Sequence, residues 1–291
     1  MCIICEGKIS EDITHLNCEE CQAVTSIPDL PNLVQLNCVR CTNLKNIGSV
    51  PNLISLLCEG CTSLTTIPHN LPRLIYLFCE ICTNLTEIPE LPSVEQLNCK
   101  NCIALTKIPL LPKLQALWCW NCTSLTSIPA FPELRQLYCS ESGLTELPRM
   151  PKLDTLFFTQ VREVKNMPLL RYLDCQYGTR IEVIEDLPNL KGLDCAVSSV
   201  RRIRNLPKLS FLGCELCKNL TELSNVPSLE TVNCRRCRLL TEIPINSYVS
   251  CEGCTWLKHN SMFEDNMKAL CKVQGIVKRK LTARKLERII P

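Results

Sequence analysis

The sequence predicts a repeat solenoid, with a parallel β-sheet on one face, extended or polyproline-like arcs on the other, and a short C-terminal α-helical tail. The first observation is an internal repeat, because residues 77–136 contain one 20-residue pattern three times: LFCEICTNLTEIPELPSVEQ, LNCKNCIALTKIPLLPKLQA and LWCWNCTSLTSIPAFPELRQ. A fixed period of about 20 to 50 residues indicates units that pack only on their neighbours. The other two observations are the recurring cysteine pairs and the recurring Ile-Pro-x-Leu-Pro segments.

The repeat covers most of the chain. Residues 1–15 keep only Cys2, Cys5 and part of the apolar pattern, so we expect a degenerate N-terminal repeat or cap there. Residues 16–257 are predicted to form a solenoid of about 13 repeats. A leucine or valine opens the pattern at thirteen positions: Leu16, Leu36, Leu56, Leu77, Leu97, Leu117, Leu137, Leu156, Leu173, Leu193, Leu212, Val232 and Val249.

One unit shows how the pattern predicts structure. Leu36 and Cys38 are two residues apart, so both side chains point to the same face of a short strand. Leu44 and Ile47 point inward again from the next arc. The return segment reads Ile-Pro-Glu-Leu-Pro at 88–92, and proline excludes an α-helix there because it fixes φ and favours extended geometry in the residue before it.

These residues resemble the leucine-rich repeat family, since Leu33, Leu36, Cys38, Cys41 and Leu44 match its pattern L-x-x-L-x-L-x-x-N/C-x-L. The short period and the proline-rich return are similar to bacterial effector repeats. The repeated Leu-x-Cys and Ile-Pro-x-Leu-Pro segments are still more similar to repeat proteins of giant DNA viruses of amoebae. The resemblance implies a non-catalytic scaffold for protein–protein interaction. A viral origin would place the protein in the host cytoplasm.

The cysteines allow two interpretations. Two pairs in adjacent turns could supply four thiolates to zinc, or the thiols could be reactive. We favour a buried ladder without metal, because the pairs recur with the repeat and because Phe158, Ser142 and Val161 replace cysteines in some turns. The small polar group at the second position is expected to bond free backbone amides. The pairs are Cys2/Cys5, Cys18/Cys21, Cys38/Cys41, Cys58/Cys61, Cys79/Cys82, Cys99/Cys102, Cys119/Cys122, Cys214/Cys217, Cys234/Cys237 and Cys251/Cys254.

Signals for catalysis are weak. The three histidines, His15, His69 and His259, lie at the edges of units, and none belongs to a catalytic or metal-binding motif. We therefore expect no enzymatic activity and no cofactor. The chain has no secretory signal pattern and no apolar run of the length that a membrane helix needs, so we expect an intracellular protein that is not secreted. We also expect it to be a monomer.

The C-terminal segment 258–291 leaves the repeat pattern. Residues 261–264 read as a capping box before a helix, and residues 266–291 carry a net charge of about +7, against +3 for the whole chain. This basic helical tail could be a solvated cap, a docking helix for another protein, or an attachment to nucleic acid or anionic lipid. The residues proposed for an anionic partner are Lys278, Arg279, Lys280, Arg284 and Lys285.

The outward positions of the strands carry the clearest candidate site. Trp118 lies between the inward Leu117 and Cys119, so its ring must face solvent on the sheet surface. Such residues could be ordinary aromatics scattered over a half-buried sheet. They could also form the centre of a protein interface, which favours tryptophan and tyrosine. The proposed partner-binding residues are Leu57, Tyr76, Phe78, Trp118, Trp120, Tyr138 and Phe157.

Overall fold

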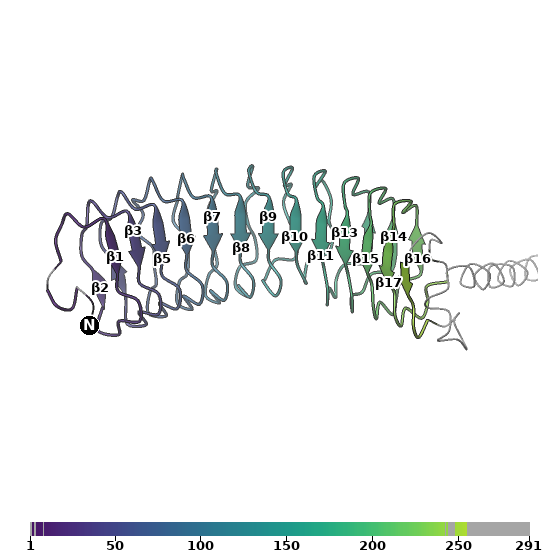
Figure 1. Cartoon of the computed structure of the whole chain (residues 1–291), viewed down its shortest axis with the longest axis horizontal. Helices are drawn as coiled ribbons and strands as arrows, with labels where there is room; N and C mark the ends of the chain where they lie inside the picture. Colours follow the sequence, from purple (N-terminus) through teal and green to yellow (C-terminus); the bar gives the residue numbers. More distant parts are fainter. Residues whose placement is uncertain (1, 3, 8, 242, 244–247, 255–291) are drawn as a thin grey trace, which may run out of the picture. The chain divides into compact units, whose positions relative to one another are not determined.

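The computed structural model describes residues 2, 4–7, 9–241, 243 and 248–254, which fall in two compact units that meet in the sequence at Val161 and Arg162. Each unit is a parallel β-solenoid, which confirms the predicted fold class (Figure 1). The described residues contain no α-helix, and none of them forms a segment able to cross a membrane as a helix. The helical tail predicted at 258–291 lies outside these residues, and the predicted repeat boundaries stay a prediction.

The first unit has one sheet of short parallel strands, each hydrogen-bonded to the strand of the next repeat (Figure 1). The register is one residue to one, as in the pairing of Leu16 with Leu36 and of Leu36 with Leu56. In order, the strands are β1 (His15–Asn17), β3 (Gln35–Asn37), β5 (Ser55–Leu57), β6 (Tyr76–Phe78), β7 (Gln96–Asn98), β8 (Ala116–Trp118), β9 (Gln136–Tyr138) and β10 (Thr155–Phe157).

The second unit repeats this arrangement with the parallel strands β11 (Tyr172–Asp174), β13 (Gly192–Asp194), β15 (Phe211–Gly213), β17 (Thr231–Asn233) and β18 (Tyr248–Ser250). In both units, the leucine or valine that opens each predicted repeat is the central residue of a strand. These central residues are buried, and the leucines at their neighbouring inward positions complete a continuous apolar core. The hydrophobic period therefore predicted the strand phase correctly.

The return arcs differ between the two units. In the second unit they pair into a parallel sheet of β12 (Val183–Glu185), β14 (Arg202–Arg204) and β16 (Glu222–Ser224). In the first unit, pairing on this side is limited to β2 (Ser26–Ile27) with β4 (Asn46–Ile47) and a bridge between Glu87 and Lys107 among the described residues. Proline explains the difference, because arcs such as 88–92 lack the backbone N–H that a ladder needs, whereas 183–185 contain no proline.

Candidate functional site

Three aromatic side chains form a stack on the outer face of the first unit's sheet. We define the aromatic strip as Trp118, Tyr138 and Phe157, which occupy paired positions on β8, β9 and β10. The ring centroids are 5.8 Å apart for Trp118 and Tyr138 and 4.8 Å apart for Tyr138 and Phe157, and both pairs are stacked. Adjacent strands lie about 4.8 Å apart, so the backbone register itself places the rings at stacking distance.

Three further proposed residues, Leu57, Tyr76 and Phe78, form a second cluster on β5 and β6. Leu57 pairs with Phe78 in register, and the ring of Tyr76 lies 6.5 Å from that of Phe78 at an angle of 53°. Asn98 on β7 separates this cluster from the aromatic strip, because it pairs with both Phe78 and Trp118. Six of the seven predicted residues therefore form two apolar clusters with a polar gap, rather than one unbroken surface.

Trp120 lies apart from the stack. Strand β8 ends at Trp118, so Trp120 belongs to the following turn and not to the strand in which the sequence pattern placed it. It is 49% exposed, whereas Trp118 and Tyr138 are half-buried. The Lys100 ammonium lies 5.8 Å from the centroid of the Trp120 ring, a cation–π distance that leaves much of the indole accessible.

Charged groups border the second cluster. Asn98 donates from Nδ2 to the Glu80 carboxylate at 3.2 Å and accepts from the Lys100 amide at 3.2 Å. The pKa of the Glu59 carboxyl is raised, first by burial and then by the neighbouring Glu80 carboxylate. The apolar side chains are thus flanked by two acids that repel each other.

A hollow of about 760 Å³ lies on the proline-rich side of the first unit. Its walls are the arcs at 87–92 and 107–112, together with His69. Leu110 is an exposed apolar side chain there, with 56% of its surface accessible. The hollow lacks aromatic side chains, so we place the candidate interface on the sheet face.

From Cys41 onward, the cysteines at the second position of the pairs form a hydrogen-bonded ladder, which we call the thiol ladder. The Cys41 thiol donates to the Cys18 carbonyl oxygen at 2.9 Å, and the Cys102 thiol donates to the Cys79 carbonyl oxygen at 3.0 Å. Sequence reasoning assigned these side chains to backbone amides, and such contacts are present beside the bonds to carbonyl oxygens. The pKa of Cys61 is lowered by its hydrogen bond with Cys38 and further by a hydrogen bond from the backbone of Cys41. In the serine turn, the Ser142 hydroxyl accepts from the Leu144 amide at 3.4 Å while it donates to the Cys139 carbonyl at 2.6 Å.

Burial and hydrogen bonding account for the chemistry of the buried cysteines. Of the 23 cysteines among the described residues, 20 are buried, which fits the predicted core ladder. At the first position, burial raises the pKa of Cys139 to about 12 and raises that of Cys119 well above its usual range, so these thiols are protonated at neutral pH. At the second position, the hydrogen bond with Cys195 outweighs burial and lowers the pKa of Cys217 to about 7, although that thiol is inaccessible to reagents.

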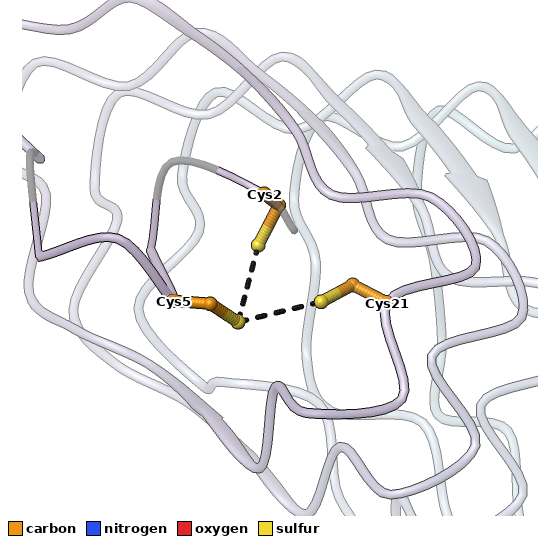
Figure 2. A group of neighbouring side chains, drawn as sticks. All are labelled: Cys2, Cys5 and Cys21. Atoms are coloured by element: carbon orange, nitrogen blue, oxygen red, sulfur yellow. Dashed lines mark hydrogen bonds between the residues drawn. The ribbon is translucent and has the colours of Figure 1, made fainter.

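Three cysteines at the N-terminal end behave differently. Cys2, Cys5 and Cys21 are only partly buried, and their sulfur atoms face one another (Figure 2). Burial acts to raise the pKa of Cys21, but hydrogen bonds from the Cys5 thiol and from Cys2 outweigh it and lower that pKa to about 7. Sequence reasoning recorded these residues only as members of pairs, because the sequence does not reveal that the degenerate turn brings its two thiols against Cys21.

The basic residues proposed for an anionic partner, Lys278, Arg279, Lys280, Arg284 and Lys285, lie outside the described residues, as do Trp256 and His259.

Comparisons with known proteins identify the fold. No family model and no curated protein sequence matches the chain. A leucine-rich repeat protein from Bacteroides ovatus matches with a TM-score of 0.50 and 16% identity over 83% of this chain and 80% of that chain. YopM from Yersinia enterocolitica matches with a TM-score of 0.50 and 20% identity over 82% of this chain and 64% of that one.

A third similar structure is the functional domain of InlJ from Listeria monocytogenes, which includes a cysteine ladder; its TM-score is 0.44, with 20% identity over 84% of this chain and 64% of that chain. Together with the strand register and the 20-residue period, the matches at a TM-score of 0.50 define a leucine-rich repeat fold. A repeat scaffold of this kind presents a long row of outward side chains on one sheet.

Proposed function

We propose that this protein is a non-catalytic scaffold that binds a protein partner through the exposed face of the parallel sheet in its first unit. The observation that carries the proposal is the stack of Trp118, Tyr138 and Phe157 on the outer side of that sheet. Clustered aromatic side chains on an exposed face are typical of the centre of a protein interface, where tryptophan and tyrosine contribute most.

The physical state of the rings favours binding. Each ring is held by its neighbours, so little side-chain entropy is lost when a partner covers it. The exposed Tyr76 and Trp120 extend the apolar area on either side of the polar gap at Asn98. Glu59 and Glu80 border that area together with the cations Lys100 and Arg40, so the partner we infer presents an apolar or aromatic segment to the rings.

The test compares two pairs of aromatic-to-alanine substitutions, one in each unit. Trp118→Ala with Tyr138→Ala removes the centre of the aromatic strip, and Tyr172→Ala with Phe211→Ala removes two exposed aromatics of the second unit, 46% and 45% accessible. Tagged full-length variants are used to capture partners from the native cell, and the captured protein is then titrated with each purified variant. We expect each strip substitution to weaken affinity by about 2 kcal/mol or more, or roughly 30-fold in Kd. Equal affinity for the two double variants would refute the assignment of the site.

A second candidate function is attachment to nucleic acid or anionic lipid through the tail. It is favoured by the net charge of about +7 in residues 266–291. Binding that vanishes on truncation after Leu270 and weakens steeply with salt would support it; no binding of the full chain at low salt would exclude it.

The remaining inferences concern the setting of the protein. We propose that it is an intracellular monomer, and that it is related to the repeat proteins of giant DNA viruses of amoebae, which would place it in a host cytoplasm. The repeated Leu-x-Cys and Ile-Pro-x-Leu-Pro segments support this kinship. Mass measurement in solution tests the oligomeric state.

A further inference from the structure

We propose that Cys2, Cys5 and Cys21 bind one thiophilic metal ion, Zn²⁺, which fastens the N-terminal turn to the first full repeat. The Cys5 sulfur lies 3.6 Å from the Cys2 sulfur and 3.4 Å from the Cys21 sulfur, and all three sulfurs lie within 4.8 Å of one another (Figure 2). Among the described residues, this is the group of metal-ligating side chains whose donor atoms converge in this way.

The distances fit a zinc–thiolate site. With Zn–S bonds of about 2.3 Å, the sulfurs of a tetrahedral site are separated by about 3.8 Å. The observed separations of 3.4 and 3.6 Å differ from that value by only a few tenths of an ångström. Small side-chain rotations would therefore suffice to accommodate the ion.

The local backbone presents the two N-terminal ligands together. The Cys5 amide donates to the Cys2 carbonyl at 3.0 Å, and the Gly7 amide donates to the Ile4 carbonyl at 3.0 Å, which closes a tight turn. Gly7 has a φ of 67°, a conformation that glycine adopts without strain. A Cys-x-x-Cys turn of this kind is a common source of two zinc ligands, and Cys21 adds a third from the neighbouring repeat.

The trio differs from the buried ladder in two respects that matter for a metal. Its cysteines are partly exposed, so an ion can reach them, whereas the ladder cysteines of the described residues are buried. Its sulfurs also contact one another, whereas a ladder thiol such as that of Cys61 donates to a backbone carbonyl, here that of Cys38 at 3.0 Å. The ladder thiols are therefore already hydrogen-bonded to backbone carbonyls, whereas the sulfurs of Cys2, Cys5 and Cys21 are accessible to a metal ion.

Three thiolates leave one coordination position for water or an external ligand. The inferred role is structural, because the three ligands come from two turns of the solenoid and the ion would cross-link them. The end of a repeat array needs a cap, and the degenerate turn at 1–15 has lost much of the apolar pattern that holds the other repeats together. This inference does not depend on the partner-binding surface.

The experiment uses the full chain, reduced and stripped of metal with a chelator. Zn²⁺ stoichiometry is measured by native mass spectrometry, and Co²⁺ is added as a spectroscopic probe whose thiolate charge-transfer absorption reports the number of bound sulfurs. Cys2→Ser, Cys5→Ser and Cys21→Ser are compared with Cys61→Ser, which changes the same repeat position as Cys21 at a buried site. Circular dichroism checks that each variant is folded.

We expect one Zn²⁺ per chain, three thiolates around Co²⁺, and affinity at least ~100-fold weaker in each variant of the trio, since even losing an outer-shell partner costs 10- to 100-fold. Cys61→Ser should bind as the wild type does. The proposal is overturned if the wild type binds no zinc, if a variant lacking all three cysteines binds as much zinc as the wild type, or if oxidation yields a Cys5–Cys21 disulfide in a protein that binds no zinc when reduced. If one single variant fails to fold, the cobalt spectrum of the wild type still decides the number of thiolates.

Discussion

Replacing Cys102 tests whether the thiol ladder stabilises the fold through hydrogen bonds or through packing alone. The Cys102 side chain is fully buried, and its thiol donates to the Cys79 carbonyl oxygen, which also accepts from the Cys82 amide at 3.2 Å. Cys102→Ala removes one buried heavy atom, worth about 1 kcal/mol, and one hydrogen bond, worth about 0.5–1.5 kcal/mol. We therefore expect a loss of about 2 kcal/mol in the free energy of unfolding.

Cys102→Ser separates the two contributions. Its hydroxyl can donate to a backbone carbonyl as Ser142 does, so it should lose less than about 1 kcal/mol. Ile103→Ala is the control, because Ile103 is 46% exposed in the same turn and its loss should cost less than about 0.5 kcal/mol.

The assay is urea unfolding with a reductant present, followed both by circular dichroism and by tryptophan fluorescence. Trp118 and Trp120 lie in the repeat next to Cys102, so fluorescence reports local unfolding there. Agreement between the two probes is required, because long repeat arrays can unfold in parts. If serine costs as much as alanine, the hydrogen bond contributes nothing; if alanine costs no more than Ile103→Ala, the ladder reasoning is refuted.

Three further predictions follow from the described residues. Ile81 has a φ of 60°, a conformation that costs a β-branched residue about 1–2 kcal/mol, whereas Asn101 occupies the same position in the next repeat. Ile81→Asn should therefore raise the urea midpoint of unfolding, and Asn101→Ile should lower it. Midpoints equal to that of the wild type would contradict the strain argument. Burial raises the pKa of Asp174 and Asp194 above 3.8, the value in the unfolded chain, so on acidification the folded protein binds these protons at a higher pH than the unfolded chain does. The free energy of unfolding therefore falls as the pH rises from 3.8 through the pKa of the folded state. Asp194→Asn should keep the bond from the Ala196 amide, raise the melting temperature at neutral pH and flatten its dependence on pH; a lower melting temperature at pH 7 would contradict this. In the reduced, metal-free protein, the partly exposed Cys21 should react first with a bulky thiol reagent and Cys5 more slowly, since the pKa of Cys21 is about 7 and that of Cys5 about 11. The 20 buried cysteines of the described residues should react only on unfolding, as mass mapping of labelled peptides would reveal.

The sequence was sufficient for the strand phase, because a solenoid repeats one local rule. The repeat positions that Leu117 and Cys119 occupy face inward in every repeat, so the outward direction of Trp118 followed without any knowledge of distant contacts. The polar gap at Asn98 could also be predicted from the repeat, since Phe78, Asn98 and Trp118 hold the same outward position in three consecutive repeats. The fold class and the position of the candidate surface were thus predictable from period alone.

Other features depended on contacts that the pattern does not encode. The second sheet at β12, β14 and β16 forms where the arcs lack the first proline of the Ile-Pro-x-Leu-Pro segment, and the repeat pattern predicted only that those arcs are extended. The direction of the thiol hydrogen bonds required the position of the preceding repeat's carbonyl groups. The approach of Cys5 to Cys21 arises in a turn too degenerate for the pattern to position.

The central claim is that the sheet face around Tyr138 binds the partner, and site-specific photo-crosslinking tests it most directly. A photoreactive amino acid is introduced at Gln136, an exposed residue on the same face of β9, or at Ser127, an exposed residue on the arc that precedes this strand. We predict a covalent adduct with one protein from position 136, lost when Trp118→Ala and Tyr138→Ala are added, and no such adduct from position 127. An adduct from position 127 alone, or one from position 136 that survives both substitutions, would contradict the account.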